Sequence, residues 1–489
     1  MIDYHAILPE LVLSGTILAV LVADVFLSNR RKWVAMPLSL AGTLASLVSL
    51  LTLLGAHRST FGGMFVIDNF AVLFKVFFLS VAVVVLAVSL RYFREGGFYQ
   101  GEYYFLLLTS FLGCLLMPSS RDLLMLFLSL ELVSAPGFLM VALRKGDVRS
   151  NEAGLKFFLI GVLSTAVMLY GMSLIYGVTG QTRLAGIATA LVNVHGGRLT
   201  LVYAAILFVV AGFAFKVAAV PFQFWAPDTY EGAPVPVAAF LGAASSAAGF
   251  AGLLQLMFVA FLHQASFWAP IFAALSILTM SVGNLLALQQ RQFIRLLAYS
   301  GIAQAGYILL PFALAGHDFA TDERAFSAAV AYILIYGVMN LGAFAVAIAV
   351  SRRSSRLMFG DFAGLARVAP VMAIGMAIFM ASLAGVPPTG GFWAKIIIFT
   401  AAIDRGGIGT VLAVVMLVNS VMSIYYYFAV PRQMFFEIET AEVAAQTRAL
   451  RPPALVTAVV ALASFAVVSA FVWPDWFARA PQFSTLLGG

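Results

Sequence analysis

The sequence predicts an all-α integral membrane protein with about 14 transmembrane helices. Hydrophobic residues occupy 62% of its 489 positions, and charged residues occupy only 10%. A soluble domain carries roughly a quarter charged residues. Apolar runs that reach the roughly 20 residues needed to cross the hydrocarbon layer recur along the whole chain. These features exclude a soluble globular domain.

The apolar runs divide into successive spans. The segment before residue 236 and the segment after residue 386 are each interrupted by proline or glycine, so we expect broken helices there. The expected spans lie near residues 6–27, 34–55, 70–90, 103–118, 122–143, 154–177, 199–220, 236–261, 267–288, 294–314, 326–350, 369–386 continuing through 391–403, 409–430 and 454–473.

Basic residues gather in alternate connections between these spans. The clusters Arg30–Lys32, Arg144–Arg149 and Arg352–Arg356 all fall on one side of the membrane. Lysine and arginine concentrate in cytoplasmic loops, so we expect both termini on the non-cytoplasmic side. The net charge of +7 is modest, and the inner loops account for it better than nucleic-acid binding does.

Cysteine and histidine usage predicts no redox cofactor and no metal in this chain. The single cysteine, Cys114, lies in an apolar run, which rules out an internal disulfide framework, an iron–sulfur cluster or a cysteine zinc site. The five histidines fall near the termini or in expected loops, without the helical spacing of a metal pair.

Two pairs of segments indicate an internal repeat. "DLLMLFLSLE" (122–131) aligns with "RLLAYSGIAQ" (295–304), which places Glu131 opposite Gln304. "VPFQFW" (220–225) resembles "VPPTGGFW" (386–393) at a similar separation. An odd number of helices in each unit inverts the second copy in the membrane, and inverted repeats with broken helices are typical of transporters.

The repeat gives one polytopic membrane domain, 1–489, with four parts. We expect two inverted five-helix repeats, 101–262 and 266–434, between N-terminal helices at 1–100 and a C-terminal helix at 435–489.

Four of the six lysines fall inside predicted spans, whereas the arginines fall in the connections. Lysine changes its protonation state readily when buried, and arginine stays charged. A site that loads and releases a proton therefore needs lysine. The four are Lys75, Lys156, Lys216 and Lys395.

The deepest charges are expected near the centre of the bilayer. Glu131 and Lys395 each lie about 15 Å from the outer end of their spans at 1.5 Å per residue, too deep for a side chain to reach the surface. A charge at that depth costs several kcal/mol unless it is paired or hydrated. We expect Glu131, Lys216 and Lys395 to handle protons, with Glu131 as the partner of Lys216. A structural ion pair that holds helices together is the alternative.

The other charged residues near span ends have plainer interpretations. Lys156 lies closer to the cytoplasmic end, so extension of its ammonium to the surface remains an alternative to proton handling. Lys75 is expected to be a surface-reaching anchor. We expect the remaining carboxylates to be interfacial or to order a loop: Glu10, Asp24, Asp68, Asp228 and Glu231.

Several motifs resemble one family. These are "KVAAVPFQFWAPDTYEGAPVPVAAFL" (216–241), "RLLAYSGIAQAGY" (295–307), "SLAGVPPTGGFWAKIIIF" (382–399) and "GEYYFLLLTSFLGCLLM" (101–117). They are similar to subunit N of bacterial NADH–quinone oxidoreductase, respiratory complex I, over essentially the whole chain. The resemblance implies two inverted five-helix repeats and proton translocation driven by quinone reduction in other subunits.

The resemblance also implies the enzyme complex, the cofactors of other subunits and the partners. The chain would act as part of an enzyme, a proton-translocating NADH:quinone oxidoreductase, without redox chemistry of its own. Quinone, flavin and iron–sulfur clusters would lie in partner subunits. The partners would be a neighbouring antiporter-like subunit, small membrane subunits and the lipid bilayer of the bacterial inner membrane.

The family's relay residues map onto Glu131, Lys156, Lys216 and Lys395. Three positions depart from the usual pattern, because this chain has Ser246 in place of a lysine and Gln223 and Gln304 in place of histidines. Serine and glutamine orient water but do not store a proton at neutral pH. Water oriented by Ser245, Ser246, Gln223, Gln304 and Tyr299 is expected to carry the proton there.

Two other functions stay open from the sequence. One is a cation/proton antiporter subunit without redox coupling. The other is a non-pumping structural paralogue that has lost the relay, which the replacement at Ser246 suggests.

Overall fold

The computed structural model describes residues 2–96, 100–351, 354, 356–437 and 452–474. Arg352 and Arg353, which contribute to the predicted charge asymmetry, lie outside the described residues, as does most of the predicted C-terminal part 435–489.

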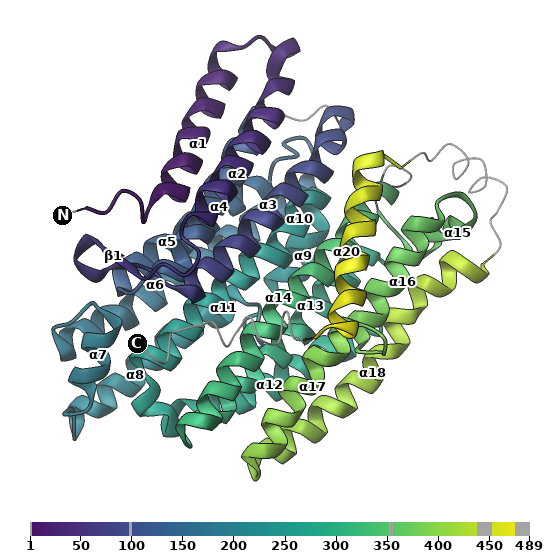
Figure 1. Ribbon diagram of the computed structural model, residues 1–489. Helices are drawn as coiled ribbons and strands as arrows, with labels where there is room; N and C mark the ends of the chain where they lie inside the picture. The colour runs from purple at the N-terminus through teal and green to yellow at the C-terminus, as the bar shows by residue number, and fades with distance from the viewer. Residues whose placement is uncertain (1, 97–99, 352–353, 355, 438–451, 475–489) are drawn as a thin grey trace.

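The described chain is almost entirely helical (Figure 1), and the predicted all-α membrane class is confirmed. The helices are α1 (Leu8–Phe26), α2 (Ala35–Leu51), α3 (Asn69–Gly96), α4 (Gln100–Leu116), α5 (Leu123–Val141), α6 (Val148–Thr179), α7 (Leu184–Leu191), α8 (Gly197–Lys216), α9 (Trp225–Gly232), α10 (Val235–Phe240), α11 (Ser246–Gln255), α12 (Ala265–Ala287), α13 (Phe293–Leu309), α14 (Phe319–Val350), α15 (Leu365–Val368), α16 (Pro370–Ala384), α17 (Gly390–Arg405), α18 (Ile408–Phe436) and α20 (Ala454–Val472).

Short turns of other helix types connect or interrupt these helices. Two are π-helical, η4 (Leu241–Ser245) and η5 (Leu256–Ala260), and they continue the span of α10 and α11. The 3₁₀ turns are η1 (Asn29–Val34), η2 (Phe61–Gly63), η3 (Met117–Ser119), η6 (Leu262–Gln264), η7 (Leu310–Leu314) and η8 (Phe359–Phe362).

Within the described residues, 13 helices are long and apolar enough to cross a membrane. The shorter helices α16 and α17 together form one more crossing, as expected for the span at 369–403. This agrees with the predicted number of about 14. The expected spans include neither the short helices α7, α9 and α15 nor the hairpin of β1 (Arg58–Thr60) and β2 (Phe65–Ile67). Asp228 and Glu231, expected in a loop, lie on α9. The strands are too short to show a two-residue periodicity.

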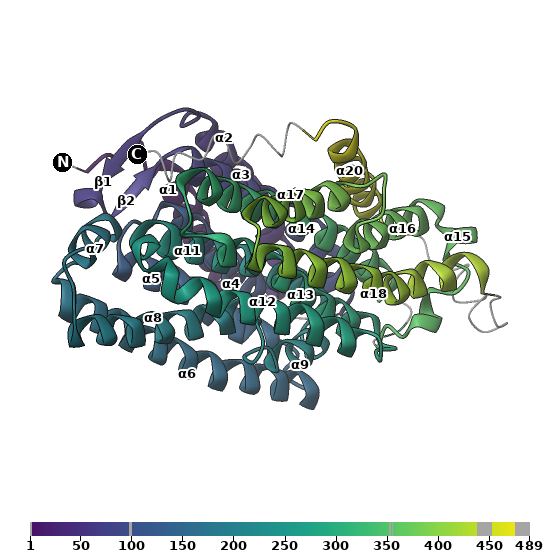
Figure 2. The same ribbon diagram turned by 90° about the horizontal axis from the view of Figure 1, so that it is seen from below.

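The centre of the molecule is formed by α14, α13 and the span that runs from α10 to η5. These spans are almost wholly buried, whereas α1, α6, α18 and α20 bury a third or less of their most apolar stretch. Figure 1 shows α1 and α2 as a pair at one side of the molecule, where α1 contacts α4 and α2 contacts α3. Figure 2 shows α6 and α8 side by side along one edge, where the two helices contact each other. The exposed outer helices present leucine, valine and phenylalanine side chains that suit lipid or a neighbouring membrane protein.

Both predicted helix breaks are present. The first lies between the end of α8 at Lys216 and the start of α9 at Trp225. The second lies between the end of α16 at Ala384 and the start of α17 at Gly390. Proline lacks a backbone N–H and cannot continue a helical ladder, so the prolines in each segment account for the breaks. Each break leaves backbone carbonyls near a lysine.

Corresponding features occur in the two halves. Asp122 caps the start of α5 and Gln292 caps the start of α13, each by accepting a hydrogen bond from a backbone N–H. An isolated β-bridge joins Asp122 to Arg183 after α6, and another joins Gln292 to Met358 after α14. The helices α6 and α14 each have 32 residues. A repeat of the predicted kind produces such matches, and its boundaries at 101–262 and 266–434 remain a prediction.

Candidate functional site

Lys216 is the last residue of α8 and is 5% exposed. Its Nζ donates a hydrogen bond of 2.8 Å to Ser134 Oγ on α5. Gly249 on α11 lies against the side chain, since a Cβ at that position would come within 2.9 Å of Lys216 Cγ. The expected ion pair of Lys216 with Glu131 is not formed among the described residues, where the ammonium instead donates to the serine hydroxyl.

Glu131 lies one helical turn before Ser134 on the same face of α5. Its side chain is half-buried, and its Oε1 is buried without a hydrogen-bond partner among the described residues. A buried carboxylate oxygen without a donor is costly. Glu131 therefore offers a place for a water molecule or a proton next to the residue that holds Lys216.

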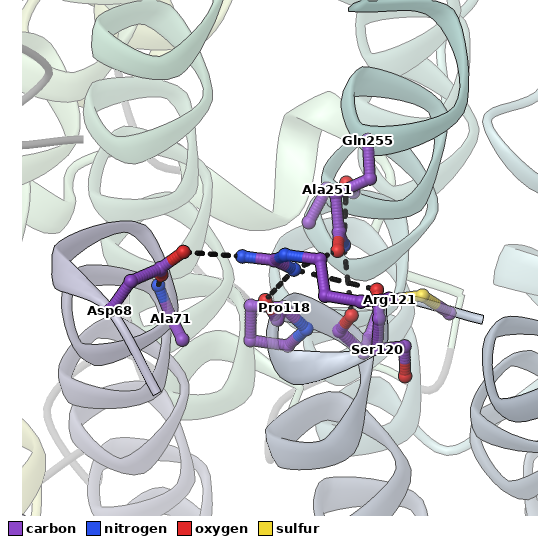
Figure 3. Close-up of polar contacts among 8 residues, drawn as sticks. Asp68, Ala71, Pro118, Ser120, Arg121, Ala251 and Gln255 are labelled. Carbon is purple, nitrogen blue, oxygen red and sulfur yellow. Dashed lines mark hydrogen bonds and ion pairs between the residues drawn. The ribbon is translucent and has the colours of Figure 1, made fainter. Parts of the chain in front are cut away.

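Arg121 fixes the entry of α5 (Figure 3). Its Nη2 lies 2.6 Å from Asp68 Oδ2, and its Nη1 donates to the carbonyl of Pro118 at 2.8 Å and to the side-chain oxygen of Gln255. Gln255 in turn donates to the carbonyl of Met117 at 2.9 Å. The cluster joins α3, α5 and α11. The carboxylate of Asp68 is 4% exposed and paired with Arg121, and its expected place at the membrane interface stays a prediction.

Lys75 also differs from expectation. Its side chain is fully buried, and its Nζ lies 2.6 Å from Glu10 Oε1 and 4.5 Å from the centre of the Phe65 ring. The prediction of a surface-reaching anchor at Lys75 is therefore wrong, and the expected interfacial position of Glu10, its buried partner, stays a prediction. The sequence places both residues near span ends, and only the packing of α1 against its neighbours encloses them.

Lys395 lies on α17 just after the second break and is 7% exposed. Its Nζ donates to the carbonyl of Ala384 at 2.9 Å and lies 4.7 Å from the centre of the Tyr307 ring. The ammonium thus sits at the C-terminal end of α16, where the helix dipole favours a cation. Gly385, with φ of +84°, permits this approach, because a Cβ there would lie 2.7 Å from Lys395 Cδ.

Gln304 lies beside the same helix end. Its Nε2 donates to the carbonyl of Leu383 at 3.0 Å and to Tyr427 Oη at 2.9 Å, and its Oε1 accepts from Tyr332 Oη at 2.5 Å. The two tyrosine partners are fully buried, and the third partner is a backbone carbonyl. Sequence reasoning identified Gln304 and missed the two tyrosines, although three tyrosines at 425–427 are a visible polar signal in an apolar span.

A small cavity lies between the two halves. Its volume is about 10 Å³, close to the space that one water molecule needs. Ser246 and Tyr230 line it from the first half, and Gly301 and Tyr336 line it from the second. Residues 217 and 218, which follow Lys216, also contact it. Ser246 donates to the carbonyl of Leu241 at 3.0 Å.

The other predicted water-orienting residues are more scattered. Gln223 lies in the first break, and its buried Oε1 has no hydrogen-bond partner in the described part of the chain. Ser245 ends η4 next to Ser246 and is 4% exposed. Tyr299 is half-buried on α13 and packs against the apolar core. The cavity includes neither Gln223 nor Tyr299 in its lining.

Lys156 reaches the protein surface. Its Nζ lies 2.8 Å from Glu152 Oε1 and 2.9 Å from Asp228 Oδ2, with the side chain 44% exposed. Arg295 from the second half contacts Asp228 at 2.9 Å and Glu231 at 2.7 Å. A hollow of about 320 Å³ lies beside them, lined by Glu152, Lys156, Asp228 and Glu231 among others. Burial raises the pKa of Asp228, but the hydrogen bonds from Lys156 and Arg295 outweigh burial and lower its pKa.

The described residues include no group of three or more histidine, cysteine or acidic side chains placed to hold a metal ion. The polar side chains described at the site are lysines, carboxylates, hydroxyls and amides, which donate and accept hydrogen bonds, and the lysines and carboxylates also bind and release protons.

Comparison with known proteins identifies the family. Residues 120–423 match the family described as NADH:quinone oxidoreductase/Mrp antiporter, TM. The chain is 41% identical over 439 residues to NADH-quinone oxidoreductase subunit N of Trichlorobacter lovleyi, which covers 89% of this chain and 88% of that protein. It is 38% identical over 503 residues to NADH-quinone oxidoreductase subunit N 2 of Symbiobacterium thermophilum, covering 98% and 96%.

Solved structures agree. A chain of respiratory complex I from Thermus thermophilus superposes with a TM-score of 0.78 at 29% identity, covering 96% of this chain and 98% of that one. A chain of the Mrp complex from Dietzia sp. DQ12-45-1b gives a TM-score of 0.83 at 20% identity, covering 99% and 98%, and shows the shared fold alone. The chain therefore belongs to the NADH:quinone oxidoreductase/Mrp antiporter membrane family, with subunit N of NADH-quinone oxidoreductase among its relatives, as the motifs predicted.

Proposed function

We propose that this chain is a membrane-arm subunit of a bacterial NADH–quinone oxidoreductase that translocates protons, coupled to quinone reduction in other subunits. Membership of the family and the relatives named subunit N support the assignment. Quinone, flavin and iron–sulfur clusters then belong to partner subunits. The chain contributes to the enzyme's reaction by moving protons, without redox chemistry of its own.

The observation that carries the proposal is the way the two deep lysines are held. Lys216 donates to the hydroxyl of Ser134, and Lys395 donates to the carbonyl of Ala384. Among the described residues neither lysine has a carboxylate partner within ion-pairing distance. A lysine bonded to neutral oxygens releases its proton without leaving an unpaired buried anion, whereas a salt-bridged lysine does leave one. Both sites therefore suit reversible proton occupancy.

The proposed route begins at the charged hollow beside Lys156. From there the proton passes to Glu131 and Lys216, and then through water at the cavity beside Ser246. It reaches Lys395 in the second half. Lysine and carboxylate store the proton, and water carries it across the gaps.

The departures at Ser246, Gln223 and Gln304 fit this route if water replaces the missing titratable groups. Ser245 and Tyr299 are proposed to orient that water. The cavity at Ser246 is narrow, so conduction there depends on a single ordered water rather than on a wide aqueous channel.

The partners and the membrane that we propose for this chain follow from its family. The partners are a neighbouring antiporter-like subunit and small membrane subunits in a bacterial inner membrane, with both termini on the non-cytoplasmic side. Two inverted repeats at 101–262 and 266–434 form the translocating unit, flanked by the helices of 1–100 and by 435–489.

Proton counting in the intact complex tests the proposal. Complexes that carry Lys216→Ala or Lys395→Ala are reconstituted in liposomes, and the protons moved per NADH oxidised are measured. We expect both variants to translocate fewer protons than the unmodified complex. Lys145→Ala, which changes an exposed lysine, is the control. Unchanged stoichiometry in both deep-lysine variants contradicts the assignment of these residues.

Two alternatives have specific observations in their favour. The matched family also includes Mrp antiporters, which favours a cation/proton antiporter. Such a subunit would give sodium-dependent proton exchange in vesicles with no redox partners on purification. The serine at 246 favours a non-pumping structural paralogue, in which Lys216→Ala and Ser246→Lys would both leave the proton stoichiometry unchanged.

A further inference from the structure

The half-helix α16 ends inside the protein, so its last carbonyls must find donors there. The final four carbonyl groups of any α-helix have no partner within the helix. The backbone satisfies two of them. Gly385 N donates to the carbonyls of Ala381 at 3.0 Å and Ser382 at 2.9 Å, and Val386 N donates to Ala381 at 2.9 Å. The left-handed conformation of Gly385 makes this C-cap possible.

Side chains satisfy the other two. Gln304 Nε2 donates to the carbonyl of Leu383 at 3.0 Å, and Lys395 Nζ donates to the carbonyl of Ala384 at 2.9 Å. Both donors come from other helices, α13 and α17. The amide and the ammonium therefore occupy two consecutive acceptors at the same negative helix end.

The orientation of the Gln304 amide follows from its partners. A backbone carbonyl only accepts hydrogen bonds, so the amide atom facing Leu383 must be the nitrogen. The oxygen then faces Tyr332, whose hydroxyl donates to it at 2.5 Å. The nitrogen's second hydrogen points to Tyr427 Oη at 2.9 Å, and that hydroxyl also lies 2.5 Å from Ser300 Oγ. Rotation of the amide would set its oxygen against the carbonyl oxygen of Leu383 and break that bond.

We infer that Gln304 is a positioning residue that permanently caps the carbonyl of Leu383 and leaves only the carbonyl of Ala384 to hold the Lys395 ammonium. An amide donates at every pH, whereas a histidine in its place would change its donors as it titrates. Proton occupancy in this part of the second half then depends on Lys395 alone. The inference rests on the proposed function, in which Lys395 carries a translocated proton.

The surroundings of Lys395 support a single titrating group. One titratable side chain lies against its ammonium in the described part of the chain, Tyr307 on α13. Tyr332 on α14 and Tyr427 on α18 contact Gln304, the neighbouring cap. The described residues give Lys395 no ion pair. Tyrosine remains neutral at physiological pH, so none of these groups supplies a competing charge there.

The experiment measures NADH-driven proton translocation by the intact complex in liposomes across a range of pH. In Gln304→Leu the carbonyl of Leu383 becomes a second acceptor for the ammonium. We expect the alkaline limb of the profile to move to higher pH by roughly one unit, the effect of one added hydrogen bond to a charged group. In Gln304→His we expect an additional titration between about pH 5 and 8.

Two further variants make the result specific. Tyr332→Phe keeps the packing but removes the donor to Gln304 Oε1, and we expect a smaller shift in the same direction. Ser276→Ala removes another buried side-chain donor to a carbonyl, that of Gly306, away from α16, and we expect no shift. Co-purification of all subunits and the NADH oxidation rate verify that each variant assembles.

The outcomes distinguish a failure of the positioning role of Gln304 from a failure of the proposed function. If Lys395→Ala reduces translocation while the Gln304→Leu and Tyr332→Phe profiles coincide with the unmodified one, the positioning role is wrong and the proposed function stands. If Ser276→Ala moves the profile as much as Gln304→Leu does, the positioning role is also wrong. If Lys395→Ala leaves translocation unchanged, the proposed relay fails, and the role of Gln304 fails with it.

Discussion

The ammonium of Lys216 lies 2.8 Å from the hydroxyl oxygen of Ser134, one helical turn from Glu131 on α5. The same helix therefore presents two acceptors to one lysine, a neutral hydroxyl and a carboxylate. The hydroxyl accepts from the ammonium, and Oε1 of Glu131 has no hydrogen-bond partner among the residues that the structure describes. The choice between the two acceptors depends on the protonation of Lys216, because only the ammonium gains from the carboxylate.

The first prediction concerns Ser134. In Ser134→Ala the ammonium loses its neutral acceptor and turns to Glu131, which forms a tight buried pair that resists proton release. We expect proton translocation per NADH to fall several-fold, with Ser134→Thr retaining most of it because threonine keeps the hydroxyl. Ser150→Ala is the matched control, since Ser150 is buried and donates only to the carbonyl of Val141. Unaltered translocation in Ser134→Ala would remove this serine from the mechanism.

The second prediction concerns the buried pair of Lys75 and Glu10. In Lys75→Met the carboxylate of Glu10 remains enclosed without its partner, and we expect a destabilisation of about 3–5 kcal/mol. The double variant with Glu10→Gln should recover most of that loss, because no charge is left unpaired. Thermal unfolding of the purified complex in detergent measures the effect. Equal destabilisation in the single and double variants would show that packing, and not the charge, dominates at this site.

The third prediction concerns Arg121, which ties α3, α5 and α11 together (Figure 3). In Arg121→Leu the carboxylate of Asp68 and the amide of Gln255 lose their donor. We expect a destabilisation of about 3 kcal/mol, as for a broken buried ion pair. Asp68→Asn should cost less, because an amide oxygen can still accept from the guanidinium. Protease susceptibility of the loop before α5 gives an independent readout, and an unchanged cleavage rate in Arg121→Leu would contradict the assigned role.

The fourth prediction concerns pH and Asp228. Lys156 and Arg295 lower the pKa of this carboxyl below its ordinary value of 3.8, although burial opposes them. A carboxyl with a lowered folded-state pKa stabilises the fold above 3.8, and that contribution is lost as the pH falls through the folded-state pKa. Because the group is partly exposed, the contribution is about 1 kcal/mol or less.

In Asp228→Asn we expect slightly lower stability at neutral pH and a smaller further loss on acidification below about pH 4. Thermal unfolding between neutral and acidic pH checks this, with Glu231→Gln as the neighbouring control, because Glu231 contacts Arg295 alone among the described cations. A steeper acid loss in Asp228→Asn than in the unmodified chain would contradict the sign.

The sequence by itself determined the membrane class, the approximate positions of the spans, both helix breaks and the burial of Lys216 and Lys395. These follow from local properties. A run of apolar residues suits lipid whatever surrounds it, and proline interrupts a helical ladder wherever it lies. The motifs also predicted the family. The positive charge of a lysine within such a run was enough to mark it as exceptional.

Only the tertiary structure decided which side chains meet. Each buried lysine meets a partner from another helix. Lys216 donates to Ser134, Lys395 donates to the end of α16 beside Gln304, and Lys75 pairs with Glu10. In a soluble protein the polar face of a helix reveals which side is buried. In a membrane the lipid is as apolar as the core, so the rotation of each helix leaves little trace in the sequence. The partners of the buried charges therefore emerge only when the helices are packed together.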